Sequence, residues 1–454
     1  MPIAESFAAS CFRRAAPMAL AALAAAAAAP CSAIDLSEAY RSAYEKDATI
    51  RAARAQADAR RERLPQARAQ LLPNVSLSAS RFKNTLDSTT PVLGRLVDSH
   101  EDYFSSNKTL TVRQPIFRKY QFADYRQAQA VVTDANATLE KEVQNLVGRV
   151  GGAYFEALLA EDQLQLIQAQ KAAYTTQLDA ARKRFAGGAG TRTDIDDAQA
   201  RLDMAIAQEL ELHQAVDLTR RQLEVLVDQP VGHLATLDPA KLKLAGPSPD
   251  RLEDWTQRAE ESSPELVSLK AQREAAQYEV EKAKAGHYPT LDAVAQWSRS
   301  DSDNINRINS RYDQKAVGLQ LNVPLYAGGY VNSVVRQAVA DLERIDQVLE
   351  ATRRDLGVRV HREYRGVTEG VLKVQALEQA VRSAQQAVIS NRRSFEAGSR
   401  TLVDILNAEQ QYAQALRDLS QARYVYLISR VRLQALSGGD HTAVLDEING
   451  WLNP

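Results

Sequence analysis

The chain has 454 residues and a formal net charge of -1, from 56 basic and 57 acidic side chains. This balance gives no basic excess to favour a nucleic-acid partner, and there is no acidic tail. Aromatic residues make up only 6% of the chain, which suits long alanine-rich helices better than a bulky globular core.

The N-terminus has the pattern of a secretory signal peptide. A short basic patch precedes an apolar stretch over residues 15–29, and small residues follow at Cys31 and Ala33. This order predicts a signal peptide at 1–33, cleaved after Ala33. The alternative is an ordinary buried or membrane helix, but the run is shorter than the ~20 residues that a membrane span needs.

Cleavage at this point removes both cysteines, Cys11 and Cys31, so the mature protein is expected to have no disulfide and no thiol chemistry. Lipidation of Cys31 is a second possibility, which Pro30 disfavours because small residues are wanted before such a cysteine. No other apolar run reaches the ~18 residues of a membrane helix. If the protein crosses a membrane, we therefore expect strands, because only helices and closed barrels satisfy their backbone groups in lipid.

The rest of the chain contains two copies of one pattern. The segment AQADARRERLPQARAQLLPNVSL recurs as AQREAAQYEVEKAKAGHYPTLDA, and LTVRQPIF recurs as LQLNVPLY. Four pairs of residues farther along keep an offset of 210: Tyr154 and Tyr364, Phe185 and Phe395, Gly188 and Gly398, Asp194 and Asp404. Such order predicts an internal duplication. We expect a first repeat at 34–230, an equatorial linker at 231–262, a second repeat at 263–438 and a C-terminal tail at 439–454.

Each repeat is predicted to begin with a helix, over residues 36–69 and near 266–285, that a proline ends. Two strands joined by a polar loop follow, with loops at 87–106 and 300–313, because apolar and polar residues alternate. The apolar set is Val75, Leu77, Ala79, Leu110, Val112, Leu291, Ala293, Ala295, Trp297, Val317, Leu319, Leu321, Val323 and Leu325. Such strands suit a membrane barrel with lipid outside and water inside, or an antiparallel sheet packed on a soluble core.

A very long helix is predicted next in each repeat, over residues 119–185 and 330–395. Apolar residues recur at steps of three and four, which over this length indicates coiled-coil packing. At 1.5 Å per residue each helix is a rod of roughly 100 Å. Such a rod needs partner helices along its length, from this chain or from other copies.

The long helices end at two turns, FAGGAGTRTD and FEAGSRTLVD. Gly188 and Gly398 suit the left-handed conformation that ends a helix. Return helices are expected at 194–227 and 402–436, and an irregular stretch at 228–249 connects the repeats.

Both turns also carry a Thr-x-x-Asp spacing, Thr191 to Asp194 and Thr401 to Asp404. This spacing is typical of a helix N-cap with an acid in the first turn. Asp404 could also form an i, i+4 ion pair with Arg400. The third possibility is functional: if the turns lie where a helical tube narrows, several copies would form charged rings that sort cations from anions.

Catalytic constellations are not evident in the sequence. The six histidines show no ligand-type pairing, and there is no Walker loop, nucleophile elbow or dinucleotide fingerprint. The sequence therefore predicts no catalytic residue, no metal site and no cofactor, and a protein that is not an enzyme.

Taken together, these features resemble the TolC family of outer-membrane exit ducts. The resemblance covers nearly all of the mature chain and rests on the duplicated plan, the strand entries ARAQLLPNVSL and AKAGHYPTLDA, and the strand exits QPIF and VPLY. Its most specific part is FEAGSRTLVDILNAEQQYAQALRDLSQARYVYLISRVRLQALSG.

The resemblance implies a mainly α fold with a membrane β-barrel portion, built as a homotrimer. Each protomer would give four strands to a shared barrel in the bacterial outer membrane, in contact with its lipid, and its helices would form a periplasmic tunnel that tapers shut. The implied partners are a periplasmic adaptor and an inner-membrane ABC or RND-type transporter, whose docking untwists the helices and opens the conduit.

The family also implies a gate at the tapered end. Arg400 is expected to pair with Asp194, beside Thr193, and Phe395 stands where a tyrosine would normally offer a hydroxyl. The substitution removes one hydrogen bond from the expected network.

The resemblance implies two further features near the turns. Asp404 stands at the position of the family's acidic selectivity ring. Asn407 stands at the position of a second acidic ring but is neutral, so we expect weaker binding of cations than in a member with both rings. The turns at Gly188 and Gly398 are where an adaptor's hairpin tips would dock.

The cargo, secreted protein or small molecules, is left open, although the missing lipidation signal favours the branch that includes type I secretion. A periplasmic adaptor is a rival interpretation, which two matched strand pairs disfavour. A soluble structural coiled coil is another, which the barrel-type strands disfavour.

Overall fold

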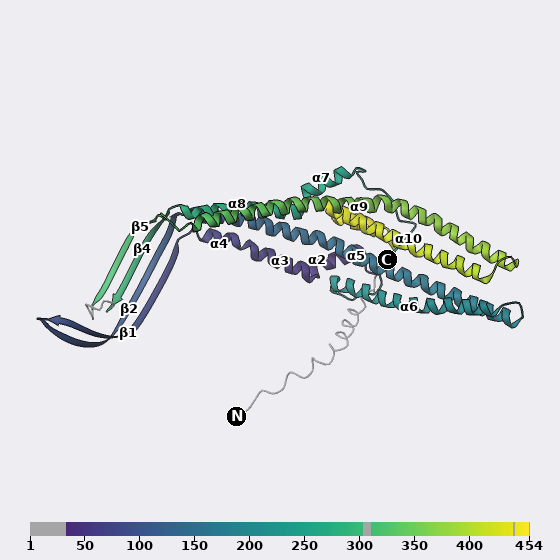
Figure 1. The fold of residues 1–454 in the computed structure, drawn as a ribbon, viewed down its shortest axis with the longest axis horizontal. Coiled ribbons are helices and arrows are strands. Elements are labelled where there is room, and N and C mark those ends of the chain that lie inside the picture. The colour runs from purple at the N-terminus through teal and green to yellow at the C-terminus, as the bar shows by residue number, and fades with distance from the viewer. Residues whose placement is uncertain (1–32, 303–309, 439–440, 454) are drawn as a thin grey trace, which may run out of the picture.

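The computed structural model describes residues 33–302, 310–438 and 441–453. Long helices run away from a four-stranded sheet that lies at one end of an elongated molecule (Figure 1). Apart from its last residue, the predicted signal peptide at 1–33 lies outside the described residues.

The rod consists of α5 (Lys119–Ala186), α6 (Arg192–Val227), α9 (Tyr330–Glu396) and α10 (Leu402–Leu436). The predicted bounds of these helices are confirmed to within two residues. α5 packs against α6 and α10, and α10 packs against α9, so the four helices form a layer in the order α6, α5, α10, α9 (Figure 1). None of the helices within the described residues is both long and apolar enough to span a membrane.

Nearer the sheet, α5 and α9 pack against shorter helices. The predicted helix over 36–69 is three helices: α2 (Leu36–Lys46), α3 (Ala48–Arg61) and α4 (Arg63–Ala69). The single-helix prediction is wrong because Asp47 leaves the helical conformation and caps α3 through Thr49 N at 2.7 Å, while Pro65 cannot donate a helical hydrogen bond. At the end of the predicted linker, α7 (Leu252–Ser262) precedes α8 (Pro264–Lys284) of the second repeat, which ends in a 3₁₀ turn (Ala285–His287).

The sheet has the order β1 (Asn74–Val92), β2 (Arg95–Phe117), β4 (Thr290–Asp301), β5 (Arg311–Asn322), and every neighbouring pair is antiparallel. The predicted loop over 87–106 is wrong, because the ladder continues to a tight turn at Leu93 and Gly94, where φ is +50° and +80°. Polar pairs across the strands, such as Thr89 Oγ1 donating to Asp98 at 2.6 Å, continue the hairpin where the composition indicated a loop.

The second predicted loop, over 300–313, is too long, because residues 300–301 belong to β4 and residues 311–313 to β5, and its part at 303–309 lies outside the described residues. β5 ends at Asn322, so Val323 and Leu325 lie beyond the strand that was predicted to include them. Pro324 lies between them and cannot donate to a ladder.

The predicted alternation is confirmed by the register of all four strands. Val75, Val112, Ala295 and Val317 form one row of partners across the sheet, and the next row contains Leu77, Leu110 and Trp297. This face is open, since Leu77 is 70% exposed and Val317 88%. The alternative of a sheet packed on a soluble core is therefore not supported, because no described element covers the apolar face.

A compact layer covers one side of the rod at mid-height. β3 (Thr236–Leu237) from the linker pairs with β6 (Leu452–Asn453) from the tail, and α11 (His441–Asn449) packs on α2. The hydroxyl of buried Tyr154 on α5 donates to the carbonyls of Ile34 and Ala235 at 3.0 Å. The tail thus contributes to the main hydrophobic core.

Candidate functional site

Two turns close the end of the rod opposite the sheet, a first tip (residues 184–195) and a second tip (residues 394–405) (Figure 1). Gly188 and Gly398 have φ of +74° and +76°, and each N–H donates to the phenylalanine carbonyl three residues earlier, at 3.0 and 2.9 Å. A Cβ on either glycine would meet no atom within 4 Å. The left-handed backbone, rather than lack of space, therefore requires glycine, and the predicted helix ends are confirmed. Adaptor docking at these turns stays a prediction.

Each tip begins its return helix with a capping box. Thr191 and Asp194 cap α6, and Thr401 and Asp404 cap α10, through reciprocal side-chain to backbone hydrogen bonds. Hydrogen bonds from the Thr401 backbone and hydroxyl, each 2.9 Å long, hold the pKa of Asp404 below its ordinary value of 3.8, and nearby Arg400 adds to this. The carboxylate is thus ionised at neutral pH, as a selectivity ring requires.

Within one chain, Arg400 pairs with the aspartate of its own tip. Its guanidinium lies 3.5 Å from Asp404, as the i, i+4 alternative predicted. The Asp194 carboxylate accepts from its own cap, Thr191 N, at 3.0 Å, and Thr193 is exposed beside it. No Arg400–Asp194 bond forms among the described residues of this single chain, so that link stays a prediction for contact between copies.

Phe395 joins the two tips in a way that the sequence did not predict. Its ring lies 4.2 Å from the guanidinium carbon of Arg184, at the end of α5, which is cation–π geometry. Arg184, Asp194, Phe395 and Leu402 also line one cavity of about 390 Å³ between the tips. The ring therefore makes an interhelical contact without the hydroxyl that a tyrosine would offer.

Asn407 of α10 accepts a hydrogen bond from α6. Arg201 of α6 donates to Asn407 Oδ1 at 2.7 Å and to Gln410 Oε1 at 2.5 Å. Arg201 lies two helical turns after Asp194, on the same face of α6. That spacing was the available signal for a residue that sequence reasoning missed.

The other missed residue is Glu409, whose side chain is only 9% exposed. It pairs with Arg392 of α9 at 2.6 Å and accepts a hydrogen bond from Gln177 of α5. An acidic residue within the apolar stripe of α10 was the signal, because buried carboxylates are almost always paired. Glu409 therefore connects α9, α10 and α5 just above the tips.

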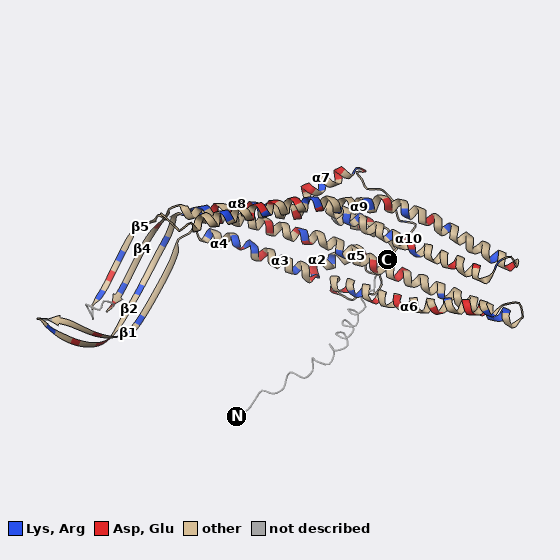
Figure 2. Cartoon of the chain, viewed as in Figure 1, with Lys and Arg blue, Asp and Glu red and all other residues tan. Residues whose placement is uncertain are grey.

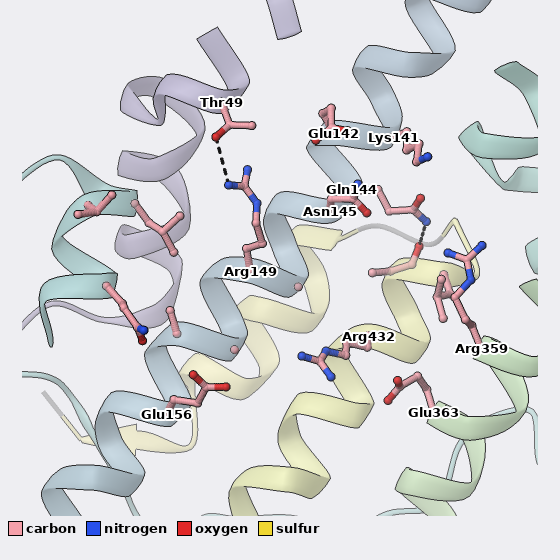
Figure 3. Close-up of a pocket in the computed structure, with 18 of the residues that line it drawn as sticks. Thr49, Lys141, Glu142, Gln144, Asn145, Arg149, Glu156, Arg359, Glu363 and Arg432 are labelled. Atoms are coloured by element: carbon pink, nitrogen blue, oxygen red, sulfur yellow. Dashed lines mark hydrogen bonds between the residues drawn. The ribbon is translucent and has the colours of Figure 1, made fainter. Parts of the chain in front are cut away.

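A second hollow lies beside the middle of α5 (Figure 3). It has a volume of about 910 Å³ and receives residues from all four helices of the rod. Its wall mixes charges of both signs, including Arg149, Glu156, Glu363 and Arg432. Apolar side chains, such as Leu218 and Val225, lie between these charges. Among the described residues, no group of His, Cys, Asp and Glu is placed to hold a metal ion.

Comparison with known proteins shows to which family the chain belongs. A model of the outer membrane efflux protein family matches residues 39–228 and 255–439. This chain belongs to the outer membrane efflux protein family. It is 36% identical, over 419 residues, to the alkaline protease secretion protein AprF of Pseudomonas aeruginosa, covering 91% of this chain and 85% of that relative. It is 30% identical to the outer membrane protein TolC of Vibrio cholerae, covering 89% of this chain and 90% of that protein.

The fold agrees with this assignment. The crystal structure of the outer membrane protein VceC of Vibrio cholerae superposes with a TM-score of 0.77 at 18% identity, over 89% of this chain and 96% of that one. The predicted resemblance to the TolC family and the predicted fold class are confirmed.

Proposed function

We propose that three copies of this chain form a conduit through the outer membrane, with the sheets in the membrane and the helices in the periplasm. The observation that carries the proposal is the open sheet. Within the described residues β1 and β5 each pair along one edge only, and the apolar face of the sheet is exposed. Edges and an apolar face of this kind are satisfied when copies close the sheet in lipid.

The edges of the helical layer support the same assembly. α6 exposes Met204, Leu218 and Val225 at multiples of seven residues, and α9 exposes Val358 and Leu372, fourteen apart. Heptad spacing is typical of helices that pack against a partner helix. Because α6 and α9 lie at opposite edges, α6 of one copy would meet α9 of the next, which is a contact that closes into a ring.

The interior of such a ring would be wet. The hollow in Figure 3 would line the tunnel in this assembly, and its mixed charges suit passage of hydrated cargo. The function proposed is transport without catalysis. The expected domain division at residues 230, 263 and 438 is part of this proposal.

The printed name of AprF refers to secretion of an alkaline protease, so we infer a secreted protein as cargo. A periplasmic adaptor would dock at the exposed turns around Gly188 and Gly398 and connect the conduit to an inner-membrane ABC transporter. Small-molecule efflux, driven through an RND-type pump, is the second candidate, which the description of the family favours.

Conductance of the purified protein tests the conduit. Light scattering should give a trimer, and a planar bilayer should record a small, cation-preferring single-channel conductance. A monomer by light scattering would refute the assembly. If the wild-type trimer does not conduct, the Arg400→Ser variant is recorded next. Conductance of this variant supports a closed gate in the wild type, whereas no conductance refutes the conduit.

A further inference from the structure

The strands carry a basic band on the same face as the apolar rows, which begins in the outermost apolar row and extends three rows farther from the helices. Beyond the row of Leu77, Leu110 and Trp297, the register places Lys108 opposite Arg299. The same face also carries Lys315 beside Trp297, and Arg81 and Lys83 on β1. Figure 2 shows basic positions recurring across the strands, away from the helices.

These five side chains have no ion-pair partner within the described part of the chain. Three carboxylates lie on the same face, in or next to the band. Asp102 lies one row beyond Lys83 and Asp313 lies opposite Arg299 on β5, while Asp301 lies in the row of Arg81. Asp313 accepts from Trp297 Nε1 at 3.0 Å, and Asp301 pairs with Arg311 at 3.0 Å. The guanidinium carbon of Arg81 lies 4.8 Å from the Phe104 ring. With Arg311 included, basic side chains outnumber carboxylates on this face, so the band has an excess of positive charge.

The cross-strand pair of Lys108 and Arg299 tells most about what the band binds. Like charges directly opposite on neighbouring strands are destabilising, and both side chains are exposed on the face that carries the apolar rows. An anion held between the two strands would remove this repulsion. Phosphate suits the site because a guanidinium binds its oxygens in a bidentate manner, while a lysine supplies a point charge.

We infer that this band binds the phosphate groups of a lipid headgroup in the outer leaflet. The inference rests on the proposed orientation, in which the apolar rows contact lipid and the ends of the strands far from the helices face the exterior. Long basic side chains at the edge of an apolar band extend toward headgroups, and each contributes to binding of anionic lipid. Because the band continues directly from the lipid-contacting rows, a lipid headgroup is a better occupant than a free anion.

Binding of diphosphoryl lipid A to the full-length trimer in detergent, measured by native mass spectrometry, tests the inference. Lys108→Gln with Arg299→Gln should weaken binding roughly thirtyfold, because each basic side chain near an anionic lipid contributes about a factor of five. Exchanging the pair, Lys108→Arg with Arg299→Lys, should restore it. Arg113→Gln, on the opposite face of the same sheet, is the matched control and should bind as wild type.

Equal binding by all four proteins, or binding of phosphatidylcholine as tight as that of lipid A, would overturn the inference. Displacement of the lipid by inorganic phosphate at constant ionic strength would assign recognition to the free ion and overturn it as well. Conductance of the same variants separates this result from the proposed function. Lost lipid binding with normal conductance supports the inference, whereas a trimer that conducts neither as wild type nor with Arg400→Ser refutes the conduit alone.

Discussion

The two tips share a backbone but differ in charge. Each has a left-handed glycine and a Thr-x-x-Asp capping box at matched positions. Across the first coil, formed by α5 and α6, Arg182 donates to the neutral Gln199 at 3.1 Å. At the matched positions in the second coil, formed by α9 and α10, Arg392 pairs with the carboxylate of Glu409 at 2.6 Å.

A second difference lies at the turn itself. Gly190 occupies the position in the first tip that Arg400 occupies in the second, and a Cβ at Gly190 would lie 3.0 Å from the backbone nitrogen of Phe185. The first tip is thus too tight for a side chain there, while the second carries a cation. The two turns thus share a backbone conformation, while a cation stands at this position in the second tip alone.

The close contact between α9 and α10 should give the largest difference in stability between the two coils. α9 meets α10 at Gly366, where a Cβ would lie 2.8 Å from Ser429 Cβ, whereas no glycine of α5 contacts α6. We expect Gly366→Ala to lower the free energy of unfolding by about 1–3 kcal/mol, because overpacking forces the helices apart.

Urea unfolding in detergent measures this effect. The control is Gly357→Ala in the same helix, where a Cβ meets no atom within 4 Å, and it should stabilise by about 0.5–1 kcal/mol. A neutral result for Gly366→Ala would mean that α9 and α10 separate without cost.

The ion pair of Glu409 with Arg392 should have the next largest effect on stability. Glu409→Gln gives the second coil the neutral acceptor of the first, and should cost about 1 kcal/mol of stability, since bonds to charged groups are stronger but Arg392 is 57% exposed. Gln199→Ala should cost less than about 0.5 kcal/mol, because the bond that it removes is exposed and uncharged. Thermal melting of both variants tests the comparison, and equal shifts would remove the distinction between the coils.

The elements that sequence predicted well are those that local patterns determine. Sustained periodicity and end signals located α5, α6, α9 and α10 to within two residues. The extended β1–β2 hairpin was missed because its ladder depends on cross-strand pairs such as Thr85 and Asp102, at 2.6 Å, whose polar residues individually favour a loop. The break at Asp47 was missed because a capping aspartate inside a helical pattern resembles any exposed residue.

At the tips, too, local motifs were predicted from the sequence and contacts between distant residues were not. The capping boxes followed from four-residue motifs and were predicted. The contacts of Arg184 with Phe395 and of Arg201 with Asn407 join residues more than 200 positions apart, and only the packing of the two coils brings them together. The Arg400–Asp194 link stays a prediction because a contact between copies requires a second chain.

Loss of Arg400 should change the gate without unfolding it. Arg400→Ser removes an exposed side chain, so stability should change by less than about 1 kcal/mol, while the link to Asp194 of a neighbouring copy is lost and conductance should rise. The matched control is Arg192→Ser in the first tip, which removes an i, i+4 pair with Asp196 at 3.3 Å. Single-channel recording tests both variants. A rise for both, or for neither, would contradict a gate that depends on Arg400 and not on Arg192.

Cation preference should show the smallest and most specific effect. Asp404→Ala removes one carboxylate per copy from the proposed ring, so the reversal potential in a salt gradient should move toward zero, with a smaller shift for Asp194→Ala. Because the pKa of Asp404 is lowered by its Thr401 hydrogen bonds, half of its charge is lost only at a pH below the ordinary aspartate value of 3.8. The midpoint of the loss of wild-type selectivity should therefore lie below that pH. A midpoint above it would assign the selectivity to a different carboxylate, and equal shifts for the two variants would distribute the ring over both tips.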